Sequence, residues 1–487
     1  YVKENCGEVL CAEIGARPKG LSEEVDLKEL SLNGDMSYSP NQEKLKVELH
    51  TKRSFLEIKK TFIYPEDLKP IAIAFVITFV CLVLFFLIIN NLKIDFKLGE
   101  KKFTELSVII FLASIFMPHP IFNIGLMFSL LFVLKEFRFR RLFSNKINII
   151  FIVYFFVLFL NDLFVSASSY HNLKATETYL PFLILPIYVS CIKDSKALRT
   201  LPFFAILLGF GLFLTSILNV AIFKNLDYLS FVEFTKFTHP VYYSYLVSFS
   251  IFYLFLYSKM ENLHKNIGQV LLFFFLILAG SKLVITITII IYIGLIIKNK
   301  KALLMVIGGL VVLALFPPVQ KRFDEILNLN DLSIVSEKVI AESSDSRING
   351  LTLRFLLWQE SVKSINTIPE YMLGLGVGGS TNEILKENLK NRGLSSYKQY
   401  STHNQFVNVF MRAGLVGILS LLMIIIYGFY KAIKSKNKML LIMVIMFMFA
   451  MLTESVFQRI LGIYFFTTIL LFLMKSIFLN EDSNNWN

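Results

Sequence analysis

The feature that most constrains this chain is a series of apolar segments that begins at residue 71 and continues almost to the C-terminus. A membrane-spanning helix needs about 20 predominantly apolar residues. Segments approaching that length occur at about thirteen places: 71–90, 105–117, 121–134, 147–167, 178–192, 201–222, 239–257, 267–280, 282–297, 302–316, 404–430, 439–456 and 460–474. Because backbone polar groups cannot bond to water inside lipid, these runs predict helices. We therefore expect an all-α polytopic membrane protein with about twelve core transmembrane helices and one extra N-terminal crossing.

The composition supports this class. Of the 487 residues, 55% are hydrophobic and 17% are charged, and the mean hydropathy is +0.62. Soluble domains carry about 45–50% apolar and about 25% charged residues. A single soluble enzyme, a disordered chain and a disulfide-rich module are thereby excluded. The net charge of +13 is expected to orient the helices rather than to bind nucleic acid. No Cys/His cluster indicates a metal, and Cys6 and Cys11 are readable as a pair or as free thiols.

The distribution of Lys and Arg predicts the topology. Basic residues collect in four short connections: 135–146, 193–199, 298–301 and 431–438. These connections alternate along the chain, so all four can lie in the cytoplasm under the positive-inside rule. The intervening connections are then outside: 168–177, 223–238 and 317–403. The last has about 85 residues, and a loop of that size is usually functional.

This outside loop contains an apolar periodicity and a glycine-rich stretch, both before the apolar segment 404–430. Phe355, Trp358, Val362 and Ile365 recur at helical spacing and predict an amphipathic helix, which suits the membrane boundary or simple packing on the bundle. The glycine-rich stretch 374–379 lacks the Gly-Lys-Ser/Thr of a phosphate-binding loop, so we interpret it as a tight turn that lets chain segments approach closely.

The sharpest motif follows at the start of a membrane helix. His403 and Asn404 are followed by nine residues and then by Gly414-Leu415-Val416-Gly417. Alone, the histidine would be an interfacial polar residue, and the glycine pair would be a packing notch between helices. The two elements at this fixed spacing are more specific to a function than the histidine or the glycine pair alone.

Polar residues near membrane depth compete with this motif. Glu454 and Arg459 are costly in lipid, and we interpret them as a structural ion pair across a helix end. His119, His171 and His239 are interpreted as polar boundary residues, with His239 also a candidate for lining the site.

The motif resembles the signature of the O-antigen ligase family, which includes O-antigen polymerases and bacterial protein O-oligosaccharyltransferases. His403-Asn404 and 414–417 match that signature without a gap. Arg354, Trp358 and the stretch 374–379 are similar to an earlier Arg…Trp…Gly pattern of the family. The predicted architecture is also similar, since such proteins are bundles with both ends cytoplasmic and one large periplasmic loop late in the chain.

The resemblance implies en bloc transfer of a glycan from undecaprenyl diphosphate to an acceptor on the periplasmic side. It assigns catalysis to His403, as the base, and to Arg354, whose guanidinium suits the charge on the departing diphosphate. Further donor contacts are expected from Arg347, Lys236 and Asn404. No metal and no cofactor are expected. Lipid A core is the first choice of acceptor, which makes the protein an O-antigen ligase, and a repeat-unit polymerase or a protein O-oligosaccharyltransferase is the alternative.

The chain departs from the family pattern in two ways. The outside loop at 223–238 has no Arg where the family often has a second functional one, and Lys236 offers charge without the paired hydrogen bonds of a guanidinium. The segment 1–103 has no counterpart.

The apolar segments and the family resemblance together predict the domains of the chain. They are an extracytoplasmic segment (1–70), an extra transmembrane helix with a basic cytoplasmic loop (71–103), an O-antigen-ligase-like membrane core (104–476) with its periplasmic loop (317–403), and a cytoplasmic tail (477–487). The expected location is the bacterial inner membrane, with the active site facing the periplasm and membrane lipids around it.

Two readings from other classes stay open. A transporter or flippase would place polar residues in several helices and would commonly carry internal repeats. Here few charges lie in the apolar runs and polar residues concentrate in one late loop, which favours an enzyme. A structural assembly subunit would leave the spacing of the His403 motif as coincidence.

Overall fold

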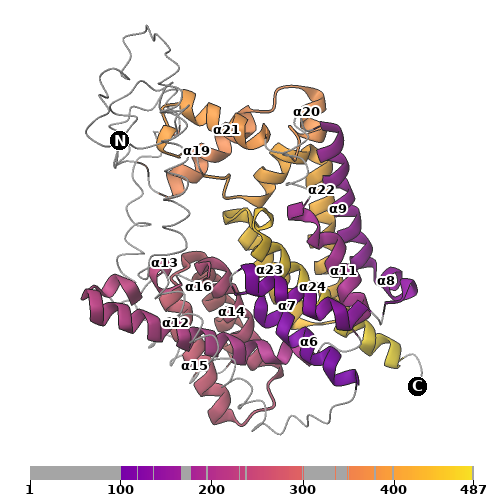
Figure 1. Ribbon diagram of the computed structural model, residues 1–487, viewed down its shortest axis with the longest axis vertical. Coiled ribbons are helices and arrows are strands. Elements are labelled where there is room, and N and C mark those ends of the chain that lie inside the picture. The colour runs from indigo at the N-terminus through magenta and orange to yellow at the C-terminus, as the bar shows by residue number, and fades with distance from the viewer. Residues whose placement is uncertain are drawn as a thin grey trace, which may run out of the picture. The chain divides into compact units, whose positions relative to one another are not determined.

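The computed structural model describes residues 100–117, 119–134, 137–165, 177–192, 196–229, 231–235, 238–298, 300, 335, 348, 350–377, 380–397 and 400–484. The chain divides into two compact units, Tyr1–Leu82 and Val83–Asn487, and all the described residues belong to the second. Within these ranges the protein consists of helices and turns without a strand, which confirms the all-α class (Figure 1). The expectations for 1–99 and for the crossing at 302–316 fall outside the described residues.

The remaining predicted apolar segments all contain helices. Their bounds are α6 Glu100–Ser114, α7 His119–Val133, α9 Lys146–Val165, α11 Pro181–Cys191, α12 Leu201–Phe223, α14 Pro240–Tyr257, α15 Asn262–Ala279, α16 Lys282–Ile296, α22 Gln405–Lys434, α23 Lys438–Thr453 and α24 Ile460–Asn484.

Five of the described apolar stretches are long and apolar enough to cross a membrane: Lys146–Val165, Ala197–Phe223, Pro240–Tyr257, Asn262–Ala279 and Gln405–Lys434. The other six apolar stretches have 10–17 residues, and in α24 the apolar stretch is Ile460–Lys475. The membrane character of the chain is thus supported, and the exact number of crossings stays a prediction.

Two groups of helices share the main core. In one, α14 packs against α12, α15 and α16. In the other, α22 packs against α9 and α23, and α24 packs against α11 and α23 (Figure 1). The central helices bury large aromatic side chains, among them Tyr243, Tyr245, Phe249 and Phe252 on α14. Large rings in close contact stabilise the bundle by burial and by edge-to-face packing.

The long loop that is predicted to lie outside forms a smaller unit of helices at one end of α22 (Figure 1). Its described helices are α19 Gly350–Lys363, α20 Ile368–Leu373 and α21 Ser380–Asn391. The first and last share a second apolar core with Met411 of α22, and a buried ion pair of 2.5 Å joins Glu360 to Arg392. The predicted amphipathic helix therefore packs on a core of its own through Leu356 and Leu357, while Phe355 and Val362 remain exposed.

Four short helical segments complete the bundle: α8 Phe139–Ser144, η2 Lys196–Thr200, η3 Leu226–Leu229 and α13 Phe231–Phe234. Two more lie in connections, η6 Ser395–Tyr397 before α22 and η7 Val456–Gln458 between α23 and α24. The η7 connection matters for the site because the residues on either side of it, Glu454 and Arg459, meet other elements at this end of the bundle.

Candidate active site

The N-terminus of α22 fixes the backbone next to the predicted catalytic histidine. Asn404 is the N-cap, and its Oδ1 accepts hydrogen bonds from the N–H groups of Phe406 at 2.9 Å and Val407 at 3.1 Å. Such a cap satisfies N–H groups that have no partner within the helix. The geometry gives Asn404 a capping role, and its contact with a donor stays a prediction.

The residue before the cap has an unusual backbone conformation. His403 has a φ of 46°, in the left-handed region that costs a non-glycine residue about 1–3 kcal/mol. The backbone just ahead is anchored, because Trp358 Nε1 donates to the Thr402 carbonyl at 2.8 Å and the Thr402 and Ser455 hydroxyls are 3.0 Å apart. These bonds tie the loop to α19 and to the end of α23, and so hold His403 in one place.

Glu454 joins the two predicted catalytic residues. Its Oε2 lies 3.2 Å from His403 Nδ1, and its Oε1 lies 3.6 Å from Arg354 Nη2. The side chains of His403 and Glu454 are 23% and 19% exposed, so the pair is partly shielded from water yet open to a ligand. Arg354 Nη1 also donates to the Gly350 carbonyl at 3.2 Å, which steadies the guanidinium on α19.

The carboxylate decides which histidine nitrogen is available for chemistry. A carboxylate accepts a hydrogen bond, so the neutral ring places its proton on Nδ1, facing Glu454. The lone pair is then on Nε2, which points away from the carboxylate. This is the arrangement in which an acid residue orients a histidine as a general base.

Opposing effects set the charge of Glu454. Burial by itself raises the pKa of this carboxyl group. The hydrogen bond from His403 and the positive charge of Arg354 outweigh burial, so the pKa lies below its usual value. Glu454 is therefore ionised at neutral pH, as its orienting role requires.

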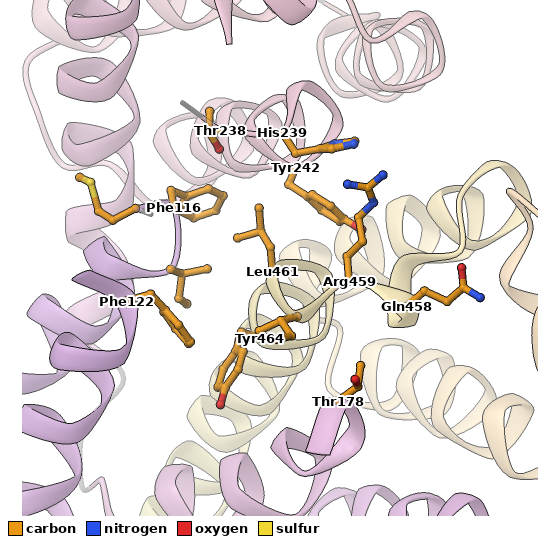
Figure 2. A pocket seen from close by; sticks show the side chains of 13 residues that line it. Phe116, Phe122, Thr178, Thr238, His239, Tyr242, Gln458, Arg459, Leu461 and Tyr464 are labelled. Carbon is orange, nitrogen blue, oxygen red and sulfur yellow. The ribbon is translucent and has the colours of Figure 1, made fainter. Parts of the chain in front are cut away.

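A cavity of about 580 Å³ is lined in part by His239 and by Arg459, which follows Glu454 by five positions. Its walls come from the end of α6, from α7, from the start of α14 and from the start of α24. Figure 2 shows His239 and Arg459 on one side of the cavity and the rings of Phe116 and Phe122 on the other. The charge of Glu454 affects the pKa of His239, so the cavity lies at the same end of the bundle as the triad.

The glycine-rich turn fastens the outside loop to α22. At Gly414 the helix is broken, with φ 60° and ψ −155°. The carbonyls of Met411 and Arg412 instead accept hydrogen bonds from Leu375 N–H at 2.9 Å and from Gly376 N–H at 3.0 Å. A Cβ on Gly414 would lie 2.4 Å from the Met372 backbone, so only glycine fits. The predicted close approach of chain segments is observed here, and the notch at Gly414 receives the loop rather than another membrane helix.

The structure thus brings together two of the five predicted site residues, His403 and Arg354, and places Asn404 beside them. Lys236 and Arg347 lie outside the described residues. The expected ion pair between Glu454 and Arg459 is wrong, because the carboxylate bonds to His403 and Arg354 while Arg459 lines the cavity. The signal for Glu454 was its charge at membrane depth, but sequence could not supply its partner 51 positions away.

Metal ligands do not gather in the described ranges, where no three His, Cys, Asp or Glu side chains form a group able to hold an ion.

The segment from α15 to α22 matches a known family. Residues 267–422 match the family described as O-Antigen ligase. This segment, about a third of the chain, is similar to O-antigen ligase domains. This match confirms the resemblance carried by the His403 motif and supports a glycan transferase of the O-antigen ligase or polymerase type. No curated protein matches the chain. His239, Glu454 and Arg459 lie outside the matched O-antigen ligase segment, so it is the structure that adds them to the candidate site.

Proposed function

We propose that the protein transfers a glycan en bloc from undecaprenyl diphosphate to an acceptor hydroxyl at the periplasmic face of the bacterial inner membrane. The observation that carries this proposal is the His403–Glu454–Arg354 triad, of which His403 and Arg354 lie in the segment that matches the O-antigen ligase family. It combines a base oriented by a carboxylate with a guanidinium, which are the two groups that glycosyl transfer from a diphosphate needs.

The reaction assigns a role to each member of the triad. His403 Nε2 takes the proton of the acceptor hydroxyl as its oxygen bonds to the anomeric carbon. The bond between that carbon and the diphosphate oxygen breaks, and its electron pair leaves with the diphosphate. Arg354 stabilises the negative charge that develops there, and a guanidinium suits phosphate oxygens because it donates hydrogen bonds in pairs. Glu454 keeps the histidine ring in the required orientation.

Ligases, polymerases and protein O-oligosaccharyltransferases of this type differ in the acceptor that receives the glycan. Lipid A core is our first choice, which makes the protein an O-antigen ligase, and the choice rests on the match to the His-Asn…Gly-x-x-Gly motif. A growing glycan, as in a repeat-unit polymerase, and a protein hydroxyl are the alternatives. The triad would perform the same chemistry on each of them.

The test is glycan transfer by purified protein, with the parent compared with His403→Gln. Glutamine can still form hydrogen bonds but is far too weak a base. We expect the variant to lose about 10²–10⁴-fold in turnover, which is the usual worth of a general base. His264 offers a matched control, because it is an exposed histidine on α15 that pairs with Glu261, the N-cap of that helix. His264→Gln should transfer glycan at the parental rate.

Near-parental turnover by His403→Gln would end the assignment of the base. A parent that moves polyprenyl-linked glycan across vesicles but forms no product with any acceptor would favour the transporter class instead.

A further inference from the structure

The short helix α20 of the long loop has an exposed apolar face. Four of its six residues are large and apolar, and none of the six is buried, although the structure describes all of them. Ile368 is 81% exposed, and Tyr371, Met372 and Leu373 are 44–47% exposed. We call these four side chains the α20 face. Contiguous apolar patches of this kind mark contacts with membranes or with other proteins.

The charged residue of α20 is used within the loop. Glu370 forms a capping box with Thr367, and its Oε2 accepts hydrogen bonds from the N–H groups of Asn366 at 2.7 Å and Thr367 at 3.0 Å. The carboxylate is thereby held at the start of the helix, and the segment 368–373 contains no Lys or Arg. Hydrocarbon therefore suits the α20 face better than an anionic headgroup does.

Contacts with two membrane helices hold α20 in place (Figure 1). Near the end of α9, Asn161 Nδ2 donates a hydrogen bond to the Leu373 carbonyl. On α22, the Met372 backbone passes so close to Gly414 that a Cβ there would lie 2.4 Å from it. The position of α20 is thus set by the bundle, and its apolar face is turned away from these contacts.

The α20 face continues an exposed apolar surface of the same two helices. On α22 a stripe at helical spacing begins one residue after Gly414 and consists of Leu415, Leu419, Met423 and Ile426. On α9 the exposed side chains next to Asn161 are Leu160, Leu163 and Phe164. Both helices are long and apolar enough to cross a membrane, so we expect these side chains to contact lipid.

We infer that the α20 face lies at the membrane boundary on the side of the long loop and contacts the acyl chains of the lipids there. Its continuity with the exposed surfaces of α9 and α22 makes lipid the occupant, because a protein partner at this place would have to displace lipid from both helices. Tyr371 then lies at the depth where amphipathic rings gather. The inference does not depend on the transfer reaction, since it concerns how the loop is anchored to the membrane.

The test is the accessibility of spin labels on the full chain in phosphatidylcholine nanodiscs. In a background without the four native cysteines, a nitroxide is attached to Ile368→Cys, to Leu419→Cys in the α22 stripe, or to Lys386→Cys, which is exposed on α21 and serves as the matched control. Collisions with O₂, which concentrates in lipid, are compared with collisions with a nickel chelate, which stays in water. Thermal unfolding of each variant checks that the bundle is intact, and Tyr371→Cys reports on the same face as Ile368→Cys.

We expect the ratio of O₂ collisions to nickel-chelate collisions to be several-fold higher at Ile368→Cys than at Lys386→Cys, and to approach the ratio at Leu419→Cys. Tyr371→Cys should behave like Ile368→Cys. Mixing phosphatidylglycerol into the nanodiscs should leave these ratios unchanged, because the segment 368–373 has no cation to attract an anionic headgroup.

Three results would overturn the inference. Equal ratios at Ile368→Cys and Lys386→Cys would place the α20 face in water. Low collision rates with both reagents would mean that protein covers it, and spin–spin broadening that disappears on dilution with unlabelled chain would identify that protein as a second copy. A preference for O₂ that is seen only with phosphatidylglycerol would replace the hydrocarbon contact with an electrostatic one.

Discussion

Glu454 illustrates what sequence can and cannot say at the scale of single residues. Its charge at the end of an apolar run marked it as a residue that must face the protein interior or a cavity. Arg459, five positions away, was the obvious partner in sequence. In the structure the Glu454 carboxylate instead contacts His403 and Arg354. The backbone turns through η7 between positions 454 and 459, so the side chains of Glu454 and Arg459 contact different elements. His403 and Arg354 were predictable from a motif, whereas the group that links them was not.

The role proposed for Arg354 can be tested with a lysine, which keeps the charge. Arg354→Lys loses the hydrogen bond to the Gly350 carbonyl and the fork that would hold two phosphate oxygens. We expect kcat/KM for glycan transfer to fall by roughly 30-fold, which corresponds to about 2 kcal/mol. Arg199, on η2, forms a pair with Glu105 far from the triad in sequence, and Arg199→Lys is the control that should keep parental kcat/KM. Parental kcat/KM for Arg354→Lys would reassign Arg354 to a structural role.

At the scale of elements, α22 is two helical segments joined at Gly414. The break releases the carbonyls of Met411 and Arg412, and the glycine-rich turn supplies their donors, so the outside loop and the helix depend on each other. Arg412 reinforces this joint by donating to the Val377 carbonyl and to Asn382, both at 2.8 Å. The glycines were visible in the sequence as sites of close approach. Which segments approach could not be predicted, because spacing along a chain does not specify contacts across it.

Gly414→Ala should therefore damage the fold rather than the chemistry. An alanine there would require a positive φ and would place its Cβ 2.4 Å from the Met372 backbone. We expect a loss of about 3 kcal/mol or more in the free energy of unfolding, measured by denaturant titration in detergent. Gly294 on α16 is the matched control, because nothing lies within 4 Å of a Cβ added to it. Gly294→Ala should be neutral or stabilising by up to about 1 kcal/mol. Equal effects of the two substitutions would contradict the joint at Gly414.

At the scale of the whole molecule, the candidate site draws on residues from distant parts of the chain: His239 before α14, Arg354 on α19, His403 before α22, Glu454 after α23 and Arg459 before α24. Consecutive crossings run in opposite directions, so the start of α22 and the end of α23 must reach the same side. The apolar runs were enough to predict this alternation. They could not predict that the helix ends would converge on one cavity, because helix packing in lipid is decided by side-chain fit rather than by hydropathy.

This alternation makes a prediction about sidedness. The 20 residues of α22 that follow the break at Gly414 extend about 30 Å, which matches the hydrocarbon thickness of about 30 Å, so the two ends of α22 should lie on opposite sides of the membrane. Single cysteines can report this in a background in which Cys6, Cys11, Cys81 and Cys191 are replaced by serine. Lys386→Cys marks the outside loop, and Lys436→Cys marks the basic connection between α22 and α23.

A membrane-impermeant maleimide should label Lys386→Cys in intact cells and Lys436→Cys only after the membrane is opened. The expected result follows from the positive-inside rule, since the connection at 431–438 holds four lysines. Labelling of both positions before permeabilisation would mean that α22 does not span the membrane. Labelling of Lys436→Cys alone would place the triad on the cytoplasmic side. In that second case His403 could not meet an acceptor in the periplasm, so the proposed direction of transfer depends on this measurement.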